Sequence, residues 1–453
     1  MSNGLTAFES RAIASLASLY AFRMMGLFMV LPVLMLYGDD YQGSTPMLMG
    51  LALGSYGLTQ AILQIPFGSL SDRIGRKPVI FIGLLIFALG SIVAASAESV
   101  YGLILGRCLQ GAGAIAGAIM ALVADLTSDE SRTKAMASIG ASIGLSFSIA
   151  LVLGPALTQF GGLSAIFIVT AVMALVGILI LWRWVPTPII TSRRHRDTGT
   201  VPELVRQMLS YGELQRLNLG VFVLHAALMA SFVAVPLVLE QKLGIPRQDH
   251  WQVYLPLLLL AFAVMVPFII MAEKFRQMKV VFVAAVALLA VMELALAFWY
   301  EQKSLFLLAL FLFFVGFNLL EATLPSLMSK IAPVGAKGTA SGIYSTFQFM
   351  GAFVGGVGGG WLLQEYGVAA VYIGASGLLI VWFLVAQNMK TPDYLSRVQV
   401  TLSETESDHA ESQLLQLSGV VEVLLIREEQ TAYLKVNPAD FNHAAMMQLD
   451  CVK

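Results

Sequence analysis

Twelve long apolar runs, each of about 20 residues or more, constrain what this chain can fold into more than any other feature. A helix of that length crosses the hydrocarbon core of a bilayer, because each helical residue rises about 1.5 Å. Only 12% of the 453 residues are charged, about half the fraction in a soluble domain. The sequence therefore predicts an all-α membrane protein with twelve transmembrane helices. We place them at residues 12–37, 46–70, 78–97, 100–126, 132–158, 163–185, 216–240, 250–272, 278–300, 304–331, 338–363 and 367–389.

The longest break between these runs leaves six runs on either side. It contains an arginine cluster at residues 193–196 and an amphipathic stretch at residues 201–209. A weak internal repeat with an offset of 201 residues supports the same division, as expected of duplicated halves. The repeat sets Pro66-Phe67 and Ser71-Asp72-Arg73 against Pro267-Phe268 and Ala272-Glu273-Lys274. We expect two pseudo-symmetric six-helix halves, 1–185 and 216–390, joined by a cytoplasmic linker at 186–215.

The distribution of Lys and Arg predicts the orientation of the helices. With both termini in the cytoplasm, four of the 27 basic residues lie in the tail after Pro392, two lie inside runs and three lie in outer loops. The remaining 18 lie in inner loops and at inner helix ends, which is the positive-inside pattern. We therefore expect both termini to be cytoplasmic. The basic residues inside runs are Arg23 and Arg107, and those in outer loops are Lys242, Arg247 and Lys303.

The composition changes after Pro392. Residues 394–453 are polar and carry four basic and nine acidic side chains. Their alternation and spacing predict the order β-α-β-β-α, which indicates a small cytoplasmic α/β domain of ferredoxin-like fold whose last strand is short or absent. The tail has a single cysteine, Cys451, so we expect no metal site. The predicted elements are residues 397–402, 404–417, 420–427 and 431–436, followed by a helix from Pro438.

A polar loop between the second and third runs carries the strongest motif of the chain. Residues 68–78 read Gly-Ser-Leu-Ser-Asp-Arg-Ile-Gly-Arg-Lys-Pro. These charges predict a position at the membrane surface, because a charge inside lipid is costly. The loop resembles, at every specified position, the signature G-x-L-[AS]-D-R-x-G-R-[KR] of the major facilitator superfamily. Together with the ferredoxin-like tail, this resemblance implies a multi-pass transporter of the bacterial inner (plasma) membrane.

We expect this loop to work as a conformational latch. Asp72 would lie against the positive N-terminal end of the eleventh helix, near Gly338. The two arginines of the loop would meet Asp125, and its glycines would allow close helix approach and a sharp turn. These pairs would form only while the inner side is closed. The alternative, that the cluster only sets topology, explains the basic residues but neither the acid nor the glycines. The latch residues are Gly68, Asp72, Arg73, Gly75, Arg76, Lys77, Asp125 and Arg132.

The fifth run resembles the antiporter motif of drug–proton exchangers, G-x8-G-x3-G-P-x2-G-G. Gly144, Gly154 and Pro155 fit this motif. Ala150 departs from it, and the final glycine pair lies further along than the motif places it. The resemblance implies proton antiport. The alternative is that these small residues serve close helix packing.

Five titratable residues lie well inside the runs, where each costs a few kcal/mol unless it is paired or used. Four fall on runs one, four, seven and ten, which line the central cavity in this superfamily. These four are Arg23, Arg107, His225 and Glu321, and the fifth is Glu293 on run nine. We expect Glu293 to be structural or to snorkel. For the arginines, the alternative to a cavity role is a guanidinium that satisfies helix carbonyls.

Glu321 and His225 are the candidates for proton coupling. A buried carboxyl takes up protons closer to neutral pH than an exposed one, and histidine titrates in that range unperturbed. Asn318 lies one turn before Glu321 on the same helix face. Polar stripes on the second and eleventh runs either face substrate or form interhelical hydrogen bonds. The cavity or substrate candidates are Arg23, Tyr56, Gln60, Gln64, Arg107, Asn318 and Gln348.

These features predict a secondary active transporter that exports a small amphiphilic solute or drug in exchange for protons. The chain has no G-x4-G-K-[ST] motif, so we expect an ion gradient, here the proton gradient, to be the energy source. We expect neither an enzymatic activity nor a cofactor. The expected partners are the lipid bilayer, the solute and protons, with no nucleic acid. The tail is expected to bind a regulator or to mediate oligomer contact. Two alternatives remain: proton-coupled uptake or symport of a nutrient, and a transporter-like sensor read through the tail.

Overall fold

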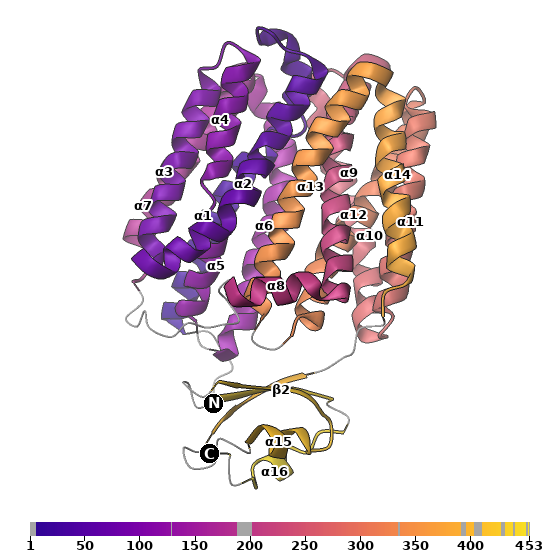
Figure 1. Ribbon diagram of the computed structural model, residues 1–453. Helices are drawn as coiled ribbons and strands as arrows, with labels where there is room; N and C mark the ends of the chain where they lie inside the picture. The colour runs from indigo at the N-terminus through magenta and orange to yellow at the C-terminus, as the bar shows by residue number, and fades with distance from the viewer. Residues whose placement is uncertain are drawn as a thin grey trace.

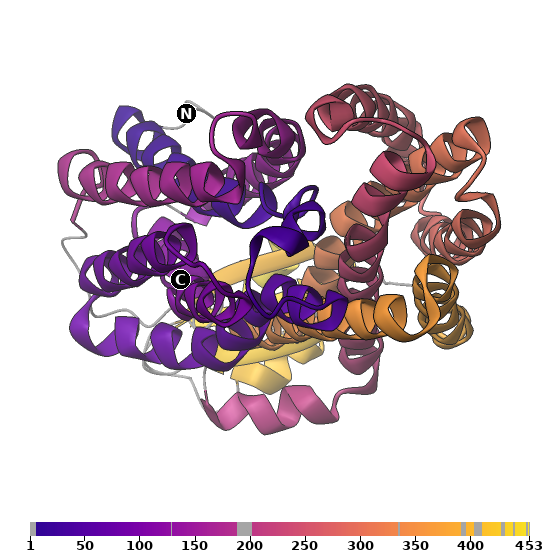
Figure 2. The ribbon, with the colours of Figure 1, turned by 90° about the horizontal axis from the view of Figure 1, so that it is seen from above.

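The long helices form one bundle, and a small sheet lies beyond one end of it (Figure 1). We call this end of the bundle the domain end and the opposite one the far end. Seen along the bundle, the first helices of the chain gather on one side and the last on the other, and α2 meets α13 between them (Figure 2). The computed structural model describes residues 6–127, 129–187, 202–333, 336–390, 396–402, 410–426, 431–437, 440–449 and 452.

The described helices agree with the predicted membrane protein of two six-helix halves. Ten segments are long and apolar enough to cross a membrane, and α1 and α13, which are less apolar, pack among them at similar length. The helical elements of the N-terminal half are α1 (Ala7–Phe28), η1 (Leu34–Asp40), α2 (Pro46–Ile74), α3 (Arg76–Ala95), α4 (Val100–Ala112), α5 (Ala116–Asp125), α6 (Asp129–Thr158) and α7 (Gly162–Arg183). The helical elements of the linker and the C-terminal half are α8 (Pro202–Ser210), α9 (Gly212–Leu237), η2 (Val238–Lys242), η3 (Arg247–Asp249), α10 (His250–Lys274), α11 (Met278–Trp299), α12 (Lys303–Ile331), α13 (Lys337–Tyr366) and α14 (Val368–Gln387).

Local chemistry sets several of the helix starts. The Thr6 side chain accepts from the Glu9 backbone, and the Glu9 carboxylate accepts in return from Thr6, which is a capping box at the start of α1. Thr45 and Ser99 cap α2 and α4 in the same position. The amphipathic stretch of the linker is the helix α8, whereas the arginine cluster at 193–196 lies outside the described residues.

Two predicted spans are interrupted rather than continuous. The first bends after Phe28, because Pro32 has no N–H for the Phe28 carbonyl and its ring would clash with it. The fourth divides into α4 and α5 around Gly113. A Cβ on Gly113 would lie 2.4 Å from the Gly83 carbonyl oxygen, so this break packs directly on the backbone of α3.

The C-terminal domain is a three-stranded antiparallel sheet of order β1-β3-β2, as a ferredoxin-like fold without its last strand requires. The last strand is reduced to one bridge between Leu402 and Val452. The final helix begins at His443, not at Pro438 as predicted, because Asn442 accepts from the Ala445 N–H as its cap. Pro438 itself and residues 404–409 lie outside the described part. The elements are β1 (Ser396–Thr401), α15 (Ala410–Leu415), β2 (Val420–Ile426), β3 (Thr431–Val436) and α16 (His443–Met446).

The sheet lies between the bundle and the helices α15 and α16 (Figure 1). One face of β3 contributes Leu434 and Val436 to the core of the small domain. The opposite face carries Lys435, whose Nζ donates to the carbonyl of Ala332 at the end of α12, 2.8 Å away. This bond joins the small domain to the bundle.

Candidate functional site

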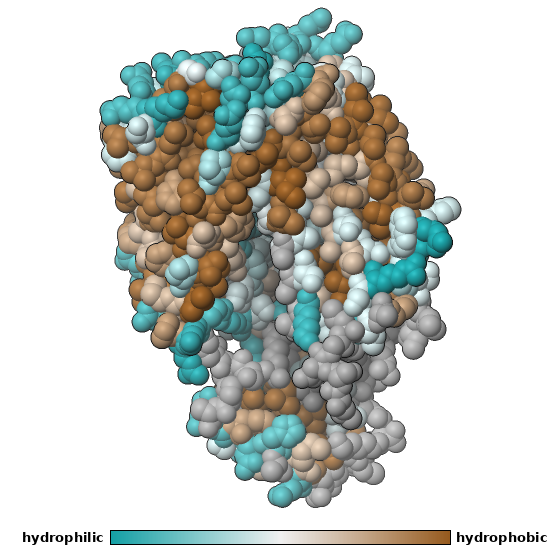
Figure 3. Space-filling model, turned by 180° about the vertical axis from the view of Figure 1, so that it is seen from behind, coloured by the Kyte–Doolittle hydropathy of each residue, from teal (hydrophilic) through white to brown (hydrophobic). Residues whose placement is uncertain are grey.

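The two halves close against each other at the far end. Arg247 donates to the carbonyl of Leu36 at 3.4 Å, and its guanidinium lies 4.9 Å from the centre of the Tyr37 ring. Nearby, Gln159 donates to the carbonyl of Gln248 at 3.3 Å. Toward the domain end the halves separate, and a hollow between them is visible on the rear face (Figure 3). The structure is therefore closed at the far end and open toward the domain end.

Glycines that the sequence analysis missed make this closure possible. A Cβ added to Gly54 on α2 would lie 2.7 Å from the carbonyl oxygen of Phe353 on α13. A Cβ added to Gly356 would lie 2.7 Å from the carbonyl oxygen of Gly50. The two helices therefore touch through their backbones. A signal was present, because Gly50 and Gly54, like Gly356 and Gly360, have the G-x3-G spacing of close helix pairs.

The loop between α2 and α3 forms an ion-pair cluster at the domain end. Gly75 has a φ of 100°, which suits glycine, and it turns the chain directly from α2 into α3. The turn brings Arg76 against the end of α2, where its guanidinium pairs with Asp72 and donates to Ser71 Oγ at 2.8 Å. Its Nε donates to Asp125 Oδ2 at 3.2 Å. Arg76 therefore joins α2, α3 and α5 within the N-terminal half.

Among the described residues, the predicted contacts of Asp72 with the other half and of Arg73 with Asp125 are not formed in this conformation. Asp72 pairs with Arg76 of its own half, and Arg73 is exposed without an ion pair among the described residues. A Cβ on Gly68 would meet nothing within 4 Å, so this glycine lies at no close helix contact here. The Arg76 pairs exist while the domain end is open, so the expectation that they form only with that end closed was wrong. Both pairs lie within one half, and opening does not separate them.

Two further basic residues complete the predicted latch. Lys77 Nζ donates to the carbonyl of Val185 at 2.8 Å, which holds the start of α3 against the end of α7. The side chain of Arg132 lies outside the described part of the structure, so its predicted contact with Asp125 stays a prediction.

Arg107 is fully buried and its donors are used within the N-terminal half. Its Nη1 donates to Gln110 Oε1 at 2.8 Å, and its Nε donates to the carbonyl of Ala52 at 3.3 Å. Gln110 donates in turn to Ser91 Oγ at 2.8 Å. This network ties α4 to α2 and α3. The geometry therefore favours the structural alternative for Arg107.

Arg23 on α1 is also buried, but only part of its guanidinium is used. Its Nη2 donates to Gln60 Oε1, and Gln60 Nε2 donates to Gln64 Oε1 at 3.3 Å. Its Nε and Nη1 have no partner among the described residues, and neither does the hydroxyl of Tyr56. The polar stripe on α2 thus forms an interhelical hydrogen bond in this conformation and leaves two donors of Arg23 unused.

His225, Glu321 and Gln348 come from α9, α12 and α13 and form one cluster. His225 Nδ1 lies 3.1 Å from the carbonyl oxygen of Val221, so this nitrogen carries a proton. Its Nε2 lies 2.8 Å from Gln348 Nε2 and 3.6 Å from Glu321 Oε2. Because an amide nitrogen only donates, Nε2 accepts and the ring is neutral in this arrangement. The Glu321 side chain is 35% exposed, which gives it access to water.

A second proton on His225 would change these contacts. An N–H at Nε2 would face the donor of Gln348 and the acceptor of Glu321. Protonation would therefore weaken the contact with α13 and strengthen the contact with α12. Asn318, one turn before Glu321, is buried with an amide nitrogen that has no partner among the described residues.

Glu293 is fully buried, so the snorkelling alternative does not apply. Its Oε1 meets Ser231 Oγ, and the same hydroxyl lies 2.7 Å from the carbonyl oxygen of Ala227. The Ser231 hydroxyl has one proton, and the Ala227 carbonyl can only accept it. The contact between Ser231 and Glu293 therefore requires a proton on the carboxyl. No cation among the described residues contacts Glu293. Glu293 is therefore a neutral carboxyl that joins α11 to α9.

The glycines of the predicted antiporter motif have different surroundings. A Cβ on Gly154 would lie 2.3 Å from the carbonyl oxygen of Met29 and 3.1 Å from the ring of Pro32, so this glycine lets α6 pack on the bend after α1. A Cβ on Gly144 would meet nothing closer than 3.9 Å. Pro155 lies inside α6. Close packing accounts for Gly154 but leaves Gly144 unexplained.

Comparison with known proteins identifies relatives of the whole chain. The family model described as Major Facilitator Superfamily matches residues 16–356 and, in a second match, 217–401. The inner membrane transport protein YajR of Escherichia coli (strain K12) is 47% identical over 437 residues, which cover 96% of this chain and 95% of that protein. The multidrug resistance protein MdtH of Aeromonas salmonicida (strain A449) is 27% identical over 391 residues, 83% of this chain and 95% of that protein.

A solved structure supports the fold. A bacterial homologue of the human lysosomal transporter Spinster, in an inward-facing and unoccupied conformation, superposes with a TM-score of 0.68 at 14% identity. The match covers 85% of this chain and 98% of that one. At this identity the likeness bears on the fold alone.

Proposed function

Because the chain belongs to the Major Facilitator Superfamily and is a multi-pass membrane transporter, we propose that it exports a small amphiphilic solute or drug in exchange for protons. The basic residues gathered at the domain end support a cytoplasmic position for that end. On this orientation the structure is the inward-open state, ready to receive solute from the cytoplasm. The MdtH relatives, which are named multidrug resistance proteins, support a drug-like solute.

The cluster of His225, Glu321 and Gln348 carries the proposal. It joins three helices, it includes a carboxylate with access to water, and its hydrogen bonds depend on the number of protons bound. A proton that reaches Glu321 or His225 from outside would change the contacts among α9, α12 and α13. Releasing it into the cytoplasm would restore the arrangement seen here. The energy of the proton gradient would thus drive the change between the two open states.

The surroundings of the cluster support an amphiphilic solute. Aromatic pairs cross between the halves, with ring centres 6.0 Å apart for Phe147 and Phe317 and 6.3 Å apart for Tyr56 and Phe349. These rings are buried against one another here and would offer apolar contact area to a solute once the halves move apart. Arg23 adds two unused donors on the other half, which suit an acceptor group of the solute.

The test is a neutral replacement of the candidate proton carrier. In proteoliposomes with a pH gradient, a panel of cationic, neutral and anionic amphiphilic dyes first identifies a transported compound. Glu321→Gln is then expected to abolish gradient-driven accumulation of that compound while keeping its counterflow exchange, because exchange moves no net proton. Glu301→Gln, at an exposed carboxylate, is the matched control.

The direction of proton flow separates antiport from the alternatives. In inverted vesicles, addition of the transported compound should move protons opposite to the compound. Proton movement in the same direction would instead support uptake or symport. Unchanged accumulation in Glu321→Gln would remove Glu321 from the coupling mechanism.

A further inference from the structure

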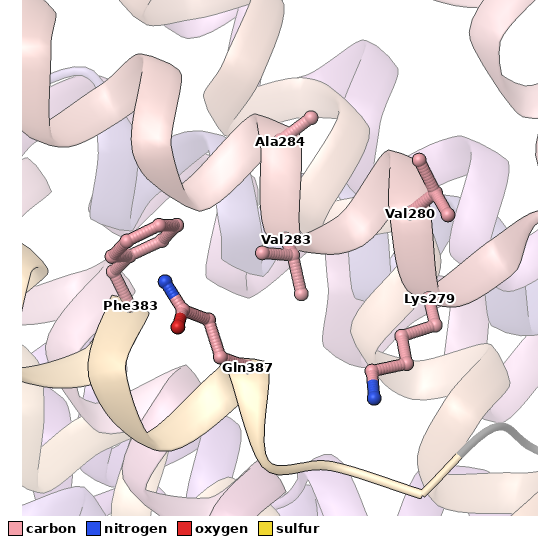
Figure 4. A pocket seen from close by; sticks show the side chains of 6 residues that line it. All are labelled: Lys279, Val280, Val283, Ala284, Phe383 and Gln387. Atoms are coloured by element: carbon pink, nitrogen blue, oxygen red, sulfur yellow. The ribbon is translucent and has the colours of Figure 1, made fainter.

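A hollow between α11 and α14 lies outside the cluster described above, on the outer surface of the bundle (Figure 4). Its volume of about 400 Å³ is within the range of sites that hold small molecules, about 300–1,000 Å³. The six residues that line it include one cation, one amide and no carboxylate. They are Lys279, Val280, Val283, Ala284, Phe383 and Gln387.

The hollow faces lipid, and its polar residues lie at one level. Val280 is 65% exposed on a helix that crosses the membrane, so this side of α11 contacts acyl chains. Lys279 lies one residue from the start of α11, and Gln387 is the last residue of α14. Both therefore lie at the domain end of the bundle, where lipid headgroups begin. Val283, Ala284 and Phe383 lie one turn or so deeper.

Both polar side chains are available to a ligand. Among the described residues, neither the Lys279 ammonium nor the Gln387 amide has a hydrogen-bond or ion-pair partner. Figure 4 shows the Gln387 amide next to Phe383, with Lys279 on the other side of Val283. A cation and an amide thus flank an apolar floor.

We propose that this hollow binds an anionic phospholipid. The phosphate would meet Lys279, the Gln387 amide would donate to phosphate or ester oxygens, and an acyl chain would cover Val283, Ala284 and Phe383. A basic side chain near the membrane surface attracts anionic headgroups in the same way. On the orientation proposed above, this lipid belongs to the inner leaflet. The assignment depends on the position of the hollow and not on the transported solute.

The experiment measures lipid retention by the full-length protein. The purified protein is titrated with phosphatidylglycerol and with phosphatidylcholine of the same chains, and bound lipids are counted by native mass spectrometry. The wild type should retain phosphatidylglycerol about fivefold better, the effect of one basic residue near a headgroup. Lys279→Gln should lose this preference. Lys390→Gln, at a lysine of the same end that does not line the hollow, should keep it.

A second variant tests the apolar floor while the charge is kept. Ala284→Phe fills the hollow from an exposed position, so it should fold normally and retain less of either lipid. Glycerol 3-phosphate, which has the charge but no chains, should not displace bound phosphatidylglycerol. A wild-type preference in Lys279→Gln, or an equal loss in Lys390→Gln, would overturn the assignment. Neither outcome bears on proton coupling, which the Glu321→Gln test addresses separately.

Discussion

At the scale of single residues, three buried polar groups in similar apolar surroundings have different numbers of partners. Arg107 donates to the Ala52 carbonyl and to Gln110, and Arg23 has two nitrogens without a partner among the described residues. Glu293 has one partner, the Ser231 hydroxyl. The sequence shows where a charge interrupts an apolar run. The number of its partners depends on which helices turn toward it, and the run does not contain that information. Their positions were therefore predictable, and their roles were not.

The protonation state of Glu293 gives a prediction at this scale. Glu293→Gln keeps a neutral side chain that can donate to Ser231, so transport and melting temperature should stay near the wild-type values. Glu293→Leu removes the bond between α11 and α9 and should cost about 1 kcal/mol of stability. Thermal unfolding in detergent measures both. Glu301→Gln, at an exposed carboxylate, is the control.

An opposite result for the glutamine variant would contradict the neutral assignment. If Glu293→Gln lost transport while its melting temperature stayed unchanged, Glu293 would carry a moving proton rather than a fixed one. The two variants therefore separate a structural carboxyl from a functional one.

At the scale of elements, the apolar runs predicted twelve long helices; among the described residues ten of these are apolar enough to cross a membrane, whereas α1 and α13 are less apolar. The runs did not predict the breaks in the first and fourth spans, since Pro32 and Gly113 stand inside runs that are otherwise continuous. In the tail, alternation predicted three strands, yet the final helix began five residues late because Asn442 caps it. The latch loop was recognisable from its motif, whereas its partners depend on the conformational state.

The backbone contact between α2 and α13 gives a prediction for an element pair. Gly356→Ala places a methyl group 2.7 Å from the Gly50 carbonyl oxygen and should weaken closure at the far end by about 1–3 kcal/mol. Met49, which is 1% exposed and precedes Gly50 on α2, reports on the opening. In a background with serine at Cys108 and Cys451, a Met49→Cys side chain should react at least several times faster with a maleimide.

The same helix offers the control. A Cβ on Gly358 would meet nothing within 4 Å, so Gly358→Ala adds the same methyl group without a clash. Labelling of Met49→Cys should stay at the wild-type rate in that variant. Equal labelling in Gly356→Ala and Gly358→Ala would show that the backbone contact does not hold the far end closed.

At the scale of the whole molecule, the latch is a prediction about the state that is not seen here. Asp72 stays paired with Arg76 while the domain end is open, so its contact with the start of α13 is left for the closed arrangement. Asp72→Asn keeps the shape and removes the charge. It should cost the outward-open state about 1–2 kcal/mol, in line with a charge at a helix terminus.

The rate at which a cysteine is labelled from the domain end measures this shift away from the outward-open state. Ser345, half-buried on α13, is replaced by cysteine in the same cysteine-free background and labelled from the domain side. Asp72→Asn should raise the labelling, whereas Asp39→Asn, at an exposed acid of the far end, should not. Wild-type labelling together with wild-type transport in Asp72→Asn would rule out the latch.

The contact of the small domain with the bundle also concerns the whole molecule. Lys435 is 7% exposed, and it lies 3.3 Å from Glu422 while it donates to the Ala332 carbonyl. A lysine at the last carbonyls of a helix also meets the negative end of the helix dipole. Because α12 carries Glu321, this bond connects the small domain to a helix of the proposed proton cluster.

Deleting residues 393–453 removes that bond but none of the residues proposed for coupling or latching. We expect the shortened protein to insert and to transport, with a lower melting temperature in detergent. Lys435→Gln should reproduce part of the loss, because it removes the bond to Ala332 together with the ion pair to Glu422. Glu422→Gln, which leaves that bond in place, is the control, and its melting temperature should stay closer to the wild-type value. A shortened protein that inserts at normal levels and is completely inactive would place the small domain within the transport mechanism itself.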